Sequence, residues 1–193
     1  MPSIEGAWPS HSLNVRLRPD IMQRLRAVQA GLAREFTELR WYDSTPHLSV
    51  ATKFMPYTET ERYARTLRSI IRFGLAWTLE FAEFCPSSTG DYVFLELSRE
   101  SQTVLKDLHG RILQGTRDIG SEEQTVKLFR SFSYSPHISV MKVGADNVER
   151  ALGCISESLR DVQMRVNAYD LVRHENDASS FPRFPVYRSY ALI

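Results

Sequence analysis

The chain has 193 residues, of which 42% are apolar and 11% aromatic, enough to build one large domain or two small ones. Its 24 Lys and Arg residues nearly balance 23 Asp and Glu residues, which excludes a strongly basic protein that grips a long duplex without sequence preference. We find no signal peptide, no membrane-spanning run and no metal-ligand spacing of the cysteines, so we expect a cytoplasmic protein with no membrane partner, a nuclear location staying open.

The first part of the chain alternates predicted strands and helices. Residues 12–17 alternate apolar and polar side chains and predict a strand, after which Pro19 opens a helix with one apolar stripe. This stripe consists of Ile21, Leu25, Val28, Leu32, Phe36 and Leu39. Residues 47–54 predict a second strand. The pattern at 58–61 predicts a capping box for a second helix, which Gly74 ends.

The second part predicts a hairpin followed by a similar alternation. The predicted elements are hairpin strands at 76–84 and 92–98, a third helix, a strand at 137–143, a helix capped by Asp146, and strands at 164–174 and 186–192. In the third helix, the residues predicted to face the core are Val104, Leu105, Leu108 and Ile112, while His109 is predicted to face solvent. This order predicts an α+β fold, in which residues 1–193 form a single two-lobed domain.

One pentapeptide occurs twice. PHLSV, which contains His47 and Ser49, recurs as PHISV, which contains His137 and Ser139. Residues two apart in a strand point to the same face, so each copy presents an imidazole beside a hydroxyl. The repeat indicates an internal duplication. We therefore expect two antiparallel-rich sheets related by a pseudo-twofold axis, helices packed outside, and a central cleft where both His-Ser pairs converge.

Such a convergence suits displacement at phosphorus. One imidazole can accept the proton of the attacking oxygen while the other protonates the leaving oxygen, because imidazole titrates close to neutral pH. The serine hydroxyls can donate hydrogen bonds to the non-bridging oxygens, where charge grows in the transition state. This scheme requires no metal and no cofactor. We predict His47, Ser49, His137 and Ser139 as the catalytic residues.

These paired His-x-Ser-apolar motifs, together with the order of the elements, resemble the two-histidine (2H) phosphoesterases. The resemblance covers nearly the whole chain and implies a metal-independent phosphodiesterase that acts as a monomer on an RNA, oligonucleotide or nucleotide substrate. Members of the family include cyclic phosphodiesterases similar to 2'-5' RNA ligases, RNA-trimming phosphodiesterases and enzymes that cleave 2'-5' oligoadenylates or cyclic dinucleotides. The substrate options are therefore a 2',3'-cyclic phosphate, a 2'-5' linkage, an RNA 3' end or a cyclic oligonucleotide.

Strand parity and proximity to the motifs suggest further substrate-binding residues. Lys53 lies six residues after His47, so regular alternation places it on the same face, where it could bind phosphate. The same alternation points Lys142 the other way. The aromatic residues just before the motifs are Trp41, Tyr42, Phe132 and Tyr134. They could stack on a base at the rim of the cleft, with core packing as the competing interpretation.

Two other classes of function stay open. A catalytically inactive RNA-binding or nucleotide-binding module would use the same cleft without turnover. A metal-dependent hydrolase would use the histidines as ligands, but neither histidine strand carries a carboxylate on that face. A basic stripe on the second helix, Arg65, Arg68 and Arg72, is interpreted as a solvated face. For His11 and His174 we expect structural roles.

Overall fold

The computed structural model describes residues 11–36, 45–71, 76–88, 90–120, 134–157, 159–174 and 185–192. The strands are β1 (His11–Val15), β2 (Leu48–Lys53), β3 (Trp77–Pro86), β4 (Tyr92–Leu97), β5 (Ile138–Lys142), β6 (Gln163–Val166), β7 (Ala168–Arg173) and β8 (Val186–Ala191). The helices are α1 (Pro19–Glu35), α2 (Thr60–Ile71), α3 (Arg99–Gly115) and α5 (Val148–Cys154), with short 3-10 turns η1 (Tyr57–Glu59) and η2 (Ala145–Asn147). The predicted α+β class is confirmed.

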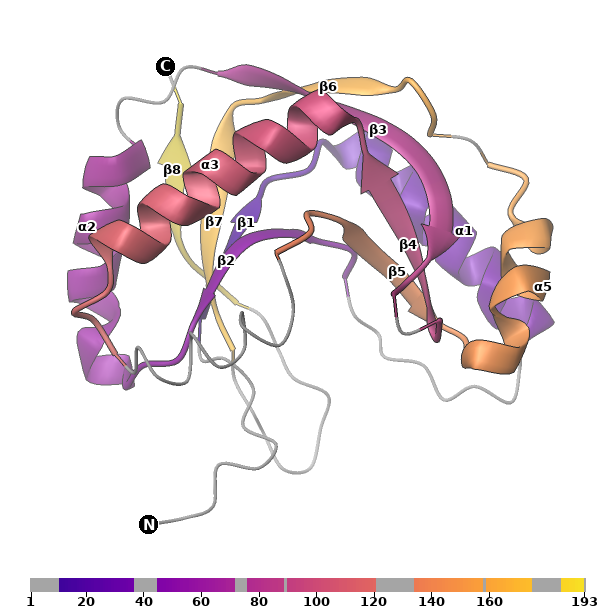
Figure 1. The fold of residues 1–193 in the computed structure, drawn as a ribbon, viewed down its shortest axis with the longest axis horizontal. Helices are drawn as coiled ribbons and strands as arrows, with labels where there is room; N and C mark the ends of the chain where they lie inside the picture. Colours follow the sequence, from indigo (N-terminus) through magenta and orange to yellow (C-terminus); the bar gives the residue numbers. More distant parts are fainter. Residues whose placement is uncertain are drawn as a thin grey trace, which may run out of the picture.

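The described strands form one curled sheet with the order β6-β3-β4-β5-β2-β1-β7-β8 (Figure 1). All of its strand pairs are antiparallel. The two predicted sheets are therefore joined edge to edge, and the joint is the pairing of Leu48 in β2 with Ile138 in β5. The sheet arches between α2 at one end and α5 at the other (Figure 1).

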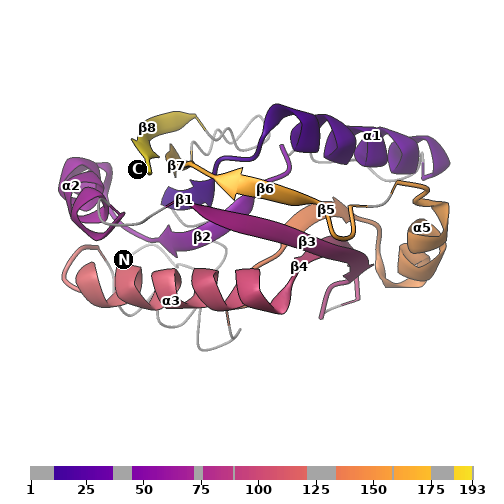
Figure 2. The ribbon, with the colours of Figure 1, turned by 90° about the horizontal axis from the view of Figure 1, so that it is seen from above.

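The sheet order has a pseudo-symmetry around this joint. One half runs β2-β1-β7-β8 outward from it and the other runs β5-β4-β3-β6, and the connections β1-α1-β2-α2 and β4-α3-β5-α5 correspond. The two halves exchange helices, because α1 packs on β5 and α3 packs on β2. Seen from above, α1 and α3 lie on opposite sides of the strands (Figure 2). Each motif strand is thus covered by a helix of the other half.

The apolar stripes read from the sequence face the core because one side of each helix lies against the sheet. The buried residues of α1 are Ile21, Leu25, Val28 and Leu32, and Phe36 is buried directly after the helix. Leu39 lies outside the described residues. In α3, Val104 is 42% exposed, so its predicted inward position is wrong. The inward face of α3 instead includes His109, which packs beside Leu105, Leu108 and Ile112.

Three predicted boundaries differ from the structure. The second helix begins at Thr60 after η1, so Thr58 lies inside a 3-10 turn and caps no helix. Asp146 likewise lies inside η2, and α5 ends at Cys154. The predicted strand 164–174 is broken at Asn167, because β6 pairs with β3 in one half and β7 pairs with β1 in the other. No helix among the described residues combines the length and hydrophobicity needed to span a bilayer.

Candidate active site

The two motif strands are neighbours in the middle of the sheet. Leu48 is paired with Ile138 in an antiparallel ladder. If this register is continued by one residue in each direction, His47 lies opposite Ser139 and Ser49 lies opposite His137. Residues directly opposite in such a ladder have Cβ atoms about 4.5–5.5 Å apart. The pairing therefore places the two motifs side by side, and His47 is close enough to His137 to act on it electrostatically.

The two motifs have the same local environment. In both copies the histidine and serine are half-buried, while the proline and the two apolar residues are buried. His47 Nδ1 lies 3.0 Å from Thr45 O, and His137 Nδ1 lies 2.7 Å from Ser135 O. A carbonyl oxygen can only accept, so Nδ1 carries the proton in both rings. This tautomer leaves Nε2 of each ring to exchange a proton with a substrate.

Each motif strand contains a β-bulge at its valine. In β2, Asn14 pairs with Ser49 and Leu13 pairs with Ala51, so Val50 is the extra residue. In β5, Val140 is extra in the same way. A bulge shifts the alternation of side chains by one residue. Beyond the bulge, the residues on the face of Ser49 and Ser139 are therefore Thr52 in β2 and Lys142 in β5.

The bulges show that the parity prediction for the two lysines is wrong. Regular alternation placed Lys53 on the face of His47 and Lys142 on the opposite face, and the structure reverses both positions. Lys142 is exposed, forms an ion pair with Asp91 at 3.5 Å and lies over the Tyr92 ring. Because Val50 and Val140 look like ordinary members of an alternating strand, the sequence contains no signal for this shift.

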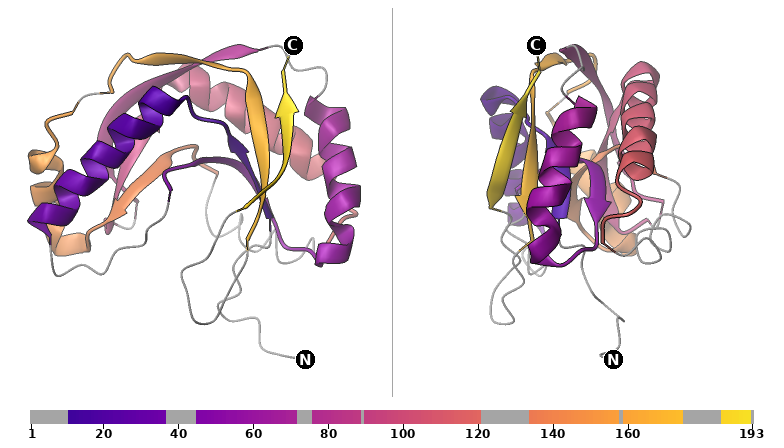
Figure 3. Two further views of the ribbon diagram at one scale, coloured as in Figure 1. Left: turned by 180° about the vertical axis from the view of Figure 1, so that it is seen from behind. Right: turned by 90° about the vertical axis from the view of Figure 1, so that its left-hand side faces the viewer.

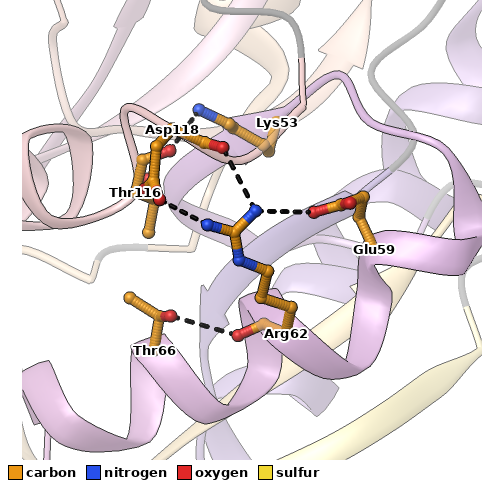
Figure 4. Close-up of polar contacts among 6 residues, drawn as sticks. All are labelled: Lys53, Glu59, Arg62, Thr66, Thr116 and Asp118. Carbon is orange, nitrogen blue, oxygen red and sulfur yellow. Dashed lines mark hydrogen bonds and ion pairs between the residues drawn. The ribbon is translucent and has the colours of Figure 1, made fainter.

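Lys53 is held inside the protein. Its side chain is 2% exposed, and its Nζ donates a hydrogen bond to Thr116 O at 2.9 Å, just past the end of α3 (Figure 4). The same turn is tied to α2 because Arg62 forms an ion pair with Asp118, and Arg62 is also paired with Glu59 in η1 (Figure 4). Lys53 therefore joins β2 to the end of α3, and the structure gives it no route to a phosphate beside His47.

The bulged carbonyls accept hydrogen bonds from side chains of the covering helices. His109 Nδ1 of α3 donates to Val50 O at 2.8 Å, and Gln29 Nε2 of α1 donates to Val140 O at 2.8 Å. The prediction that His109 faces solvent is thus wrong, since the ring is buried, and burial lowers its pKa below the ordinary value of 6.5. Neither residue was recognised from the sequence, because the contacts join distant segments.

The predicted aromatic residues have different outcomes. Tyr134 stacks on His109 with ring centroids 4.0 Å apart, and its hydroxyl donates to Ser49 O at 2.9 Å. One face of its ring is therefore already covered within the protein. Tyr42 and Phe132, like Trp41, lie outside the described residues, and their substrate-binding role stays a prediction.

The two copies of the motif differ in one neighbouring position. Phe94, which pairs with Ser139, stacks on the His137 ring, whereas Asn14, which pairs with Ser49, accepts a hydrogen bond from the Ser49 hydroxyl at 3.0 Å. Burial lowers the pKa of His137 below its ordinary value of 6.5. The hydrogen bond to Ser135 O opposes this shift, and positive charge on His47 adds to it. The position of His47 thus adds to the effect of burial on His137.

Two other histidines form a buried polar cluster at the far end of β1. His11 Nε2 lies 2.9 Å from Thr60 Oγ1, and His174 Nε2 lies 2.9 Å from Ser12 Oγ. Burial lowers the pKa of His11 to about 4, with smaller contributions from His174 and Arg173. Among the described residues, no group of three or more His, Cys, Asp or Glu side chains could hold a metal ion.

Comparison with known proteins gives one family and several similar folds. The sequence model of the 2'-5' RNA ligase superfamily matches residues 59–178, a range that includes the second motif but not the first. No curated protein matches the sequence significantly. TT0787 of Thermus thermophilus superposes with a TM-score of 0.71 at 16% identity, over 95% of this chain and 97% of that one.

Two further solved structures share the fold. E. coli LigT complexed with 3'-AMP superposes with a TM-score of 0.69 at 13% identity, over 95% of this chain and 98% of LigT. The MHV ns2 PDE domain superposes with a TM-score of 0.54 at 14% identity, over 86% of this chain and 99% of that domain. At these identities the likeness concerns the fold alone.

Proposed function

Because the chain belongs to the 2'-5' RNA ligase superfamily of 2H phosphoesterases, we propose that it is a metal-independent phosphodiesterase acting on ribonucleotide or RNA substrates. The observation that carries this proposal is the pairing of Leu48 with Ile138, which places two His-Ser pairs across one strand junction. Both motifs belong to one chain, so a monomer suffices, and the chemistry needs no cofactor. We expect it to act in the cytoplasm or nucleus.

In the proposed mechanism the two histidines have different roles. Burial favours the neutral form of His137, so its Nε2 accepts the proton of the attacking hydroxyl as the new P–O bond forms. The attacking hydroxyl belongs to water or to a ribose. His47, protonated on Nε2, gives its proton to the leaving oxygen as the old P–O bond breaks. The pair ends with its protons exchanged, and solvent restores the starting state.

The serine hydroxyls stabilise the charge of the transition state. Ser49 and Ser139 lie beside the imidazoles and can donate to the two non-bridging oxygens of the phosphate. Ser49 donates to Asn14 Oδ1 at 3.0 Å in the structure, so it must rotate away from Asn14 to reach a phosphate. Substrates that supply a ribose beside the phosphate fit this arrangement, and 2',3'-cyclic phosphates, 2'-5' linkages, RNA 3' ends and cyclic oligonucleotides all do so.

Similar folds support a nucleotide-sized ligand. LigT has been solved with phosphate, with 3'-AMP and with ATP, and the MHV ns2 domain is described as a PDE domain. These ligands concern those proteins, and for this chain they support only the choice of compounds to test first.

The test is a panel of 2',3'-cyclic nucleotides, 2'-5' oligoadenylate, RNA with a free 3' end and cyclic dinucleotides, incubated with EDTA and analysed by mass spectrometry. We expect turnover of at least one compound in wild type and loss of turnover in His47→Ala and His137→Ala. Binding of 3'-AMP without turnover of any compound would instead indicate an inactive nucleotide-binding module. Turnover in a parallel reaction without EDTA, but not in the reaction with EDTA, would indicate a metal-dependent hydrolase.

A further inference from the structure

A second concave site lies far from the histidines. A groove of about 780 Å³ runs between α2 and β8, two elements that lie side by side at one end of the arch (Figures 1 and 3). This volume is in the range of about 300–1,000 Å³ that is common for ligand sites. The residues that matter here are Glu61, Arg65, Arg68, Ile71, Arg188 and Tyr190.

The groove carries more positive than negative charge. Arg188 forms a two-pronged ion pair with Glu61, with both N–O distances at 3.1 Å, so these two charges cancel. Arg65 and Arg68 lie one turn apart on α2 and are exposed. The Glu61 carboxylate also attracts Arg65, but neither arginine forms a hydrogen bond or an ion pair with any described residue. Two guanidinium groups in the groove are therefore available to an anion.

An exposed aromatic side chain lies beside these charged residues. Tyr187 of β8 is 41% exposed, and its hydroxyl donates to Glu61 at 3.0 Å. The Arg188 guanidinium lies 5.7 Å from the centre of its ring. A basic groove beside an exposed aromatic ring is the combination by which proteins hold single-stranded nucleic acids, because the cations follow the phosphates and the ring stacks on a base.

We propose that the groove between α2 and β8 binds the phosphate backbone of a single-stranded RNA chain that extends beyond the active site. The identity of this ligand rests on the proposed function. In the order β2-β1-β7-β8, β8 is the edge strand, three strands away from β2. Ser189 shares the sheet face of Ser49 through the pairings of β1 and β7, so Arg188 and Tyr190 point to the opposite face, which α2 covers. A strand held at the histidines must therefore cross about 14 Å of sheet and then pass round the edge at β8 to reach the groove, so only strands longer than a dinucleotide gain from it.

The test measures binding without turnover. A labelled 2'-O-methyl oligonucleotide of about twelve residues, which offers no ribose 2'-hydroxyl as nucleophile, is titrated by fluorescence polarisation at several salt concentrations, with all proteins in this titration carrying His137→Ala so that attack by water is prevented as well. The variant is Arg65→Glu/Arg68→Glu. Its control is Arg26→Glu/Arg34→Glu, which changes two exposed arginines of α1 by the same charge. We expect the groove variant, but not the control, to bind more weakly, with a salt slope smaller by about 1.4, as two lost phosphate contacts predict.

Three outcomes would overturn the proposal. Equal weakening by both variants would indicate unspecific charge, and unchanged binding by the groove variant would remove the site. If inorganic phosphate or ATP displaces the oligonucleotide at concentrations near the dissociation constant of the oligonucleotide, the groove is a site for small anions. The binding readout is independent of catalysis, so a failure of the proposed phosphodiesterase activity is seen separately. Turnover of a dinucleotide substrate should be unchanged in the groove variant.

A different observation carries a second inference, which concerns His109 and Gln29. Each lies ten residues after the first residue of a 17-residue helix, α3 or α1, and each donates at 2.8 Å to the carbonyl of the bulged valine in the motif strand that its helix covers. Different residue types thus make the same contact at pseudo-equivalent positions. The two halves make the same contact with different chemical groups. This indicates that the hydrogen bond to the bulged carbonyl has a role of its own.

We infer that His109 and Gln29 are positioning residues, which hold the two bulges and so orient the His-Ser pairs. A bulge leaves its carbonyl outside the ladder, and an added donor fixes the local twist that aims the preceding serine and histidine. Because α1 and α3 cross between the halves, each half orients the motif of the other. This role concerns the proposed reaction, while the contacts themselves do not depend on it.

The test separates the donor from the packing of the His109 ring. His109→Phe keeps a ring that can stack on Tyr134 but has no donor, whereas His109→Gln keeps a donor and loses the ring. Gln29→Met is the corresponding change in α1. We expect His109→Phe and Gln29→Met to lower kcat about tenfold or more with little change in KM, because small misplacements of reacting groups are costly. His109→Gln should retain near wild-type kcat and an unchanged pH profile.

A second readout does not need turnover. In wild type and in His109→Gln, the imidazole NMR signals of His47 should agree, and in His109→Phe they should shift or broaden. Full kcat in a folded His109→Phe variant would overturn the inference. An equal loss in His109→Phe and His109→Gln, with His47 signals changed in both, would show that His109 acts through its ring packing and not through its donor.

Discussion

The Phe94 ring lies flat on the His137 imidazole, with ring centroids 3.8 Å apart and 17° between their planes. Asn14, the corresponding residue beside the first motif, accepts a hydrogen bond from Ser49 instead. The duplicated motifs therefore share the same histidine and serine residues but differ in the side chain that lies against them. In the proposed mechanism this difference favours His137 as the proton acceptor, because burial disfavours the charged imidazole.

Replacing Phe94 by Ala should move the acidic limb of the kcat/KM profile to higher pH. Burial holds the pKa of His137 below 6.5, and removal of the covering ring returns the pKa toward that value, so a larger fraction is protonated and unable to accept a proton near neutrality. The measurement is kcat/KM between pH 5 and 9. An acidic limb that stays in place, in a variant with wild-type secondary structure, would contradict the assignment of His137 as the acceptor.

His47→Ala and His137→Ala should each remove most of the activity, and the double variant should be hardly worse than either single one. Groups that act as one unit are strongly non-additive, because removing either leaves the other without its partner in the reaction. The measurement is the single-turnover rate for the best substrate of the panel. If the losses of the two single variants multiply in the double variant, the histidines act independently.

Ser49→Ala and Ser139→Ala should lower kcat more than they raise KM. Each hydroxyl is proposed to stabilise charge that grows only in the transition state, and loss of one such donor typically costs about 10² to 10³ in rate, less where a second donor remains. Thr52→Ala is a suitable control, since Thr52 shares the serine face beyond the bulge. A large rise in KM at full kcat would make the serines substrate anchors.

Lys53→Met should lower stability and leave KM unchanged. The substitution removes the donor of the buried hydrogen bond to Thr116 O, and a buried carbonyl that loses its partner costs about 1–3 kcal/mol of unfolding free energy. Urea unfolding and steady-state kinetics measure the two effects. Lys142→Met, at an exposed position, is the control and should leave stability nearly unchanged. A higher KM in a stably folded Lys53→Met variant would restore the phosphate-binding role expected from the sequence.

His11 should make the protein less stable in acid. Its pKa is about 4 in the folded protein against 6.5 in the unfolded chain, so between these values the unfolded chain binds a proton that the folded state excludes. The unfolding free energy therefore falls as pH drops from about 6.5 to about 4, by roughly 3 kcal/mol for this group. His11→Gln should show a flatter dependence in urea unfolding over that range. If the unfolding free energy depends equally on pH in the variant and in wild type, His11 is not the source of the acid sensitivity.

Much of the fold follows from local patterns, while the arrangement of the site follows from contacts between distant segments. The stripe from Ile21 to Leu32 and the alternation around the hairpin predict their elements because burial of one face sets the period. The repeated motif predicts the four central residues. The bulges at Val50 and Val140 are invisible in the sequence, because alternation is also satisfied without them. This is why Lys53 was misplaced.

The residues that surround the motifs were also beyond prediction. His109 sits among polar residues of α3, and only the packing of α3 across β2 shows why its ring is buried. Phe94 reads as an ordinary strand residue of the hairpin until β4 is placed beside β5. The arginines of α2 read as a solvated stripe until β8 is placed next to them. In each case the missing information is which elements become neighbours.

The place of β1 in the sheet affects how the protein can fold during its synthesis. β1 lies between β2 and β7, and its partners in the sheet therefore include residues 168–173, made far later than β1 itself. The contacts of β2 with α3 and β5 likewise form only after those later segments have been synthesised. Pairings between distant segments form slowly, because the intervening chain must first be ordered. A nascent chain that ends just after the first motif thus contains only β1 and β2 of the sheet, with the outer edge of each strand unpaired, and the junction between β2 and β5 is completed late.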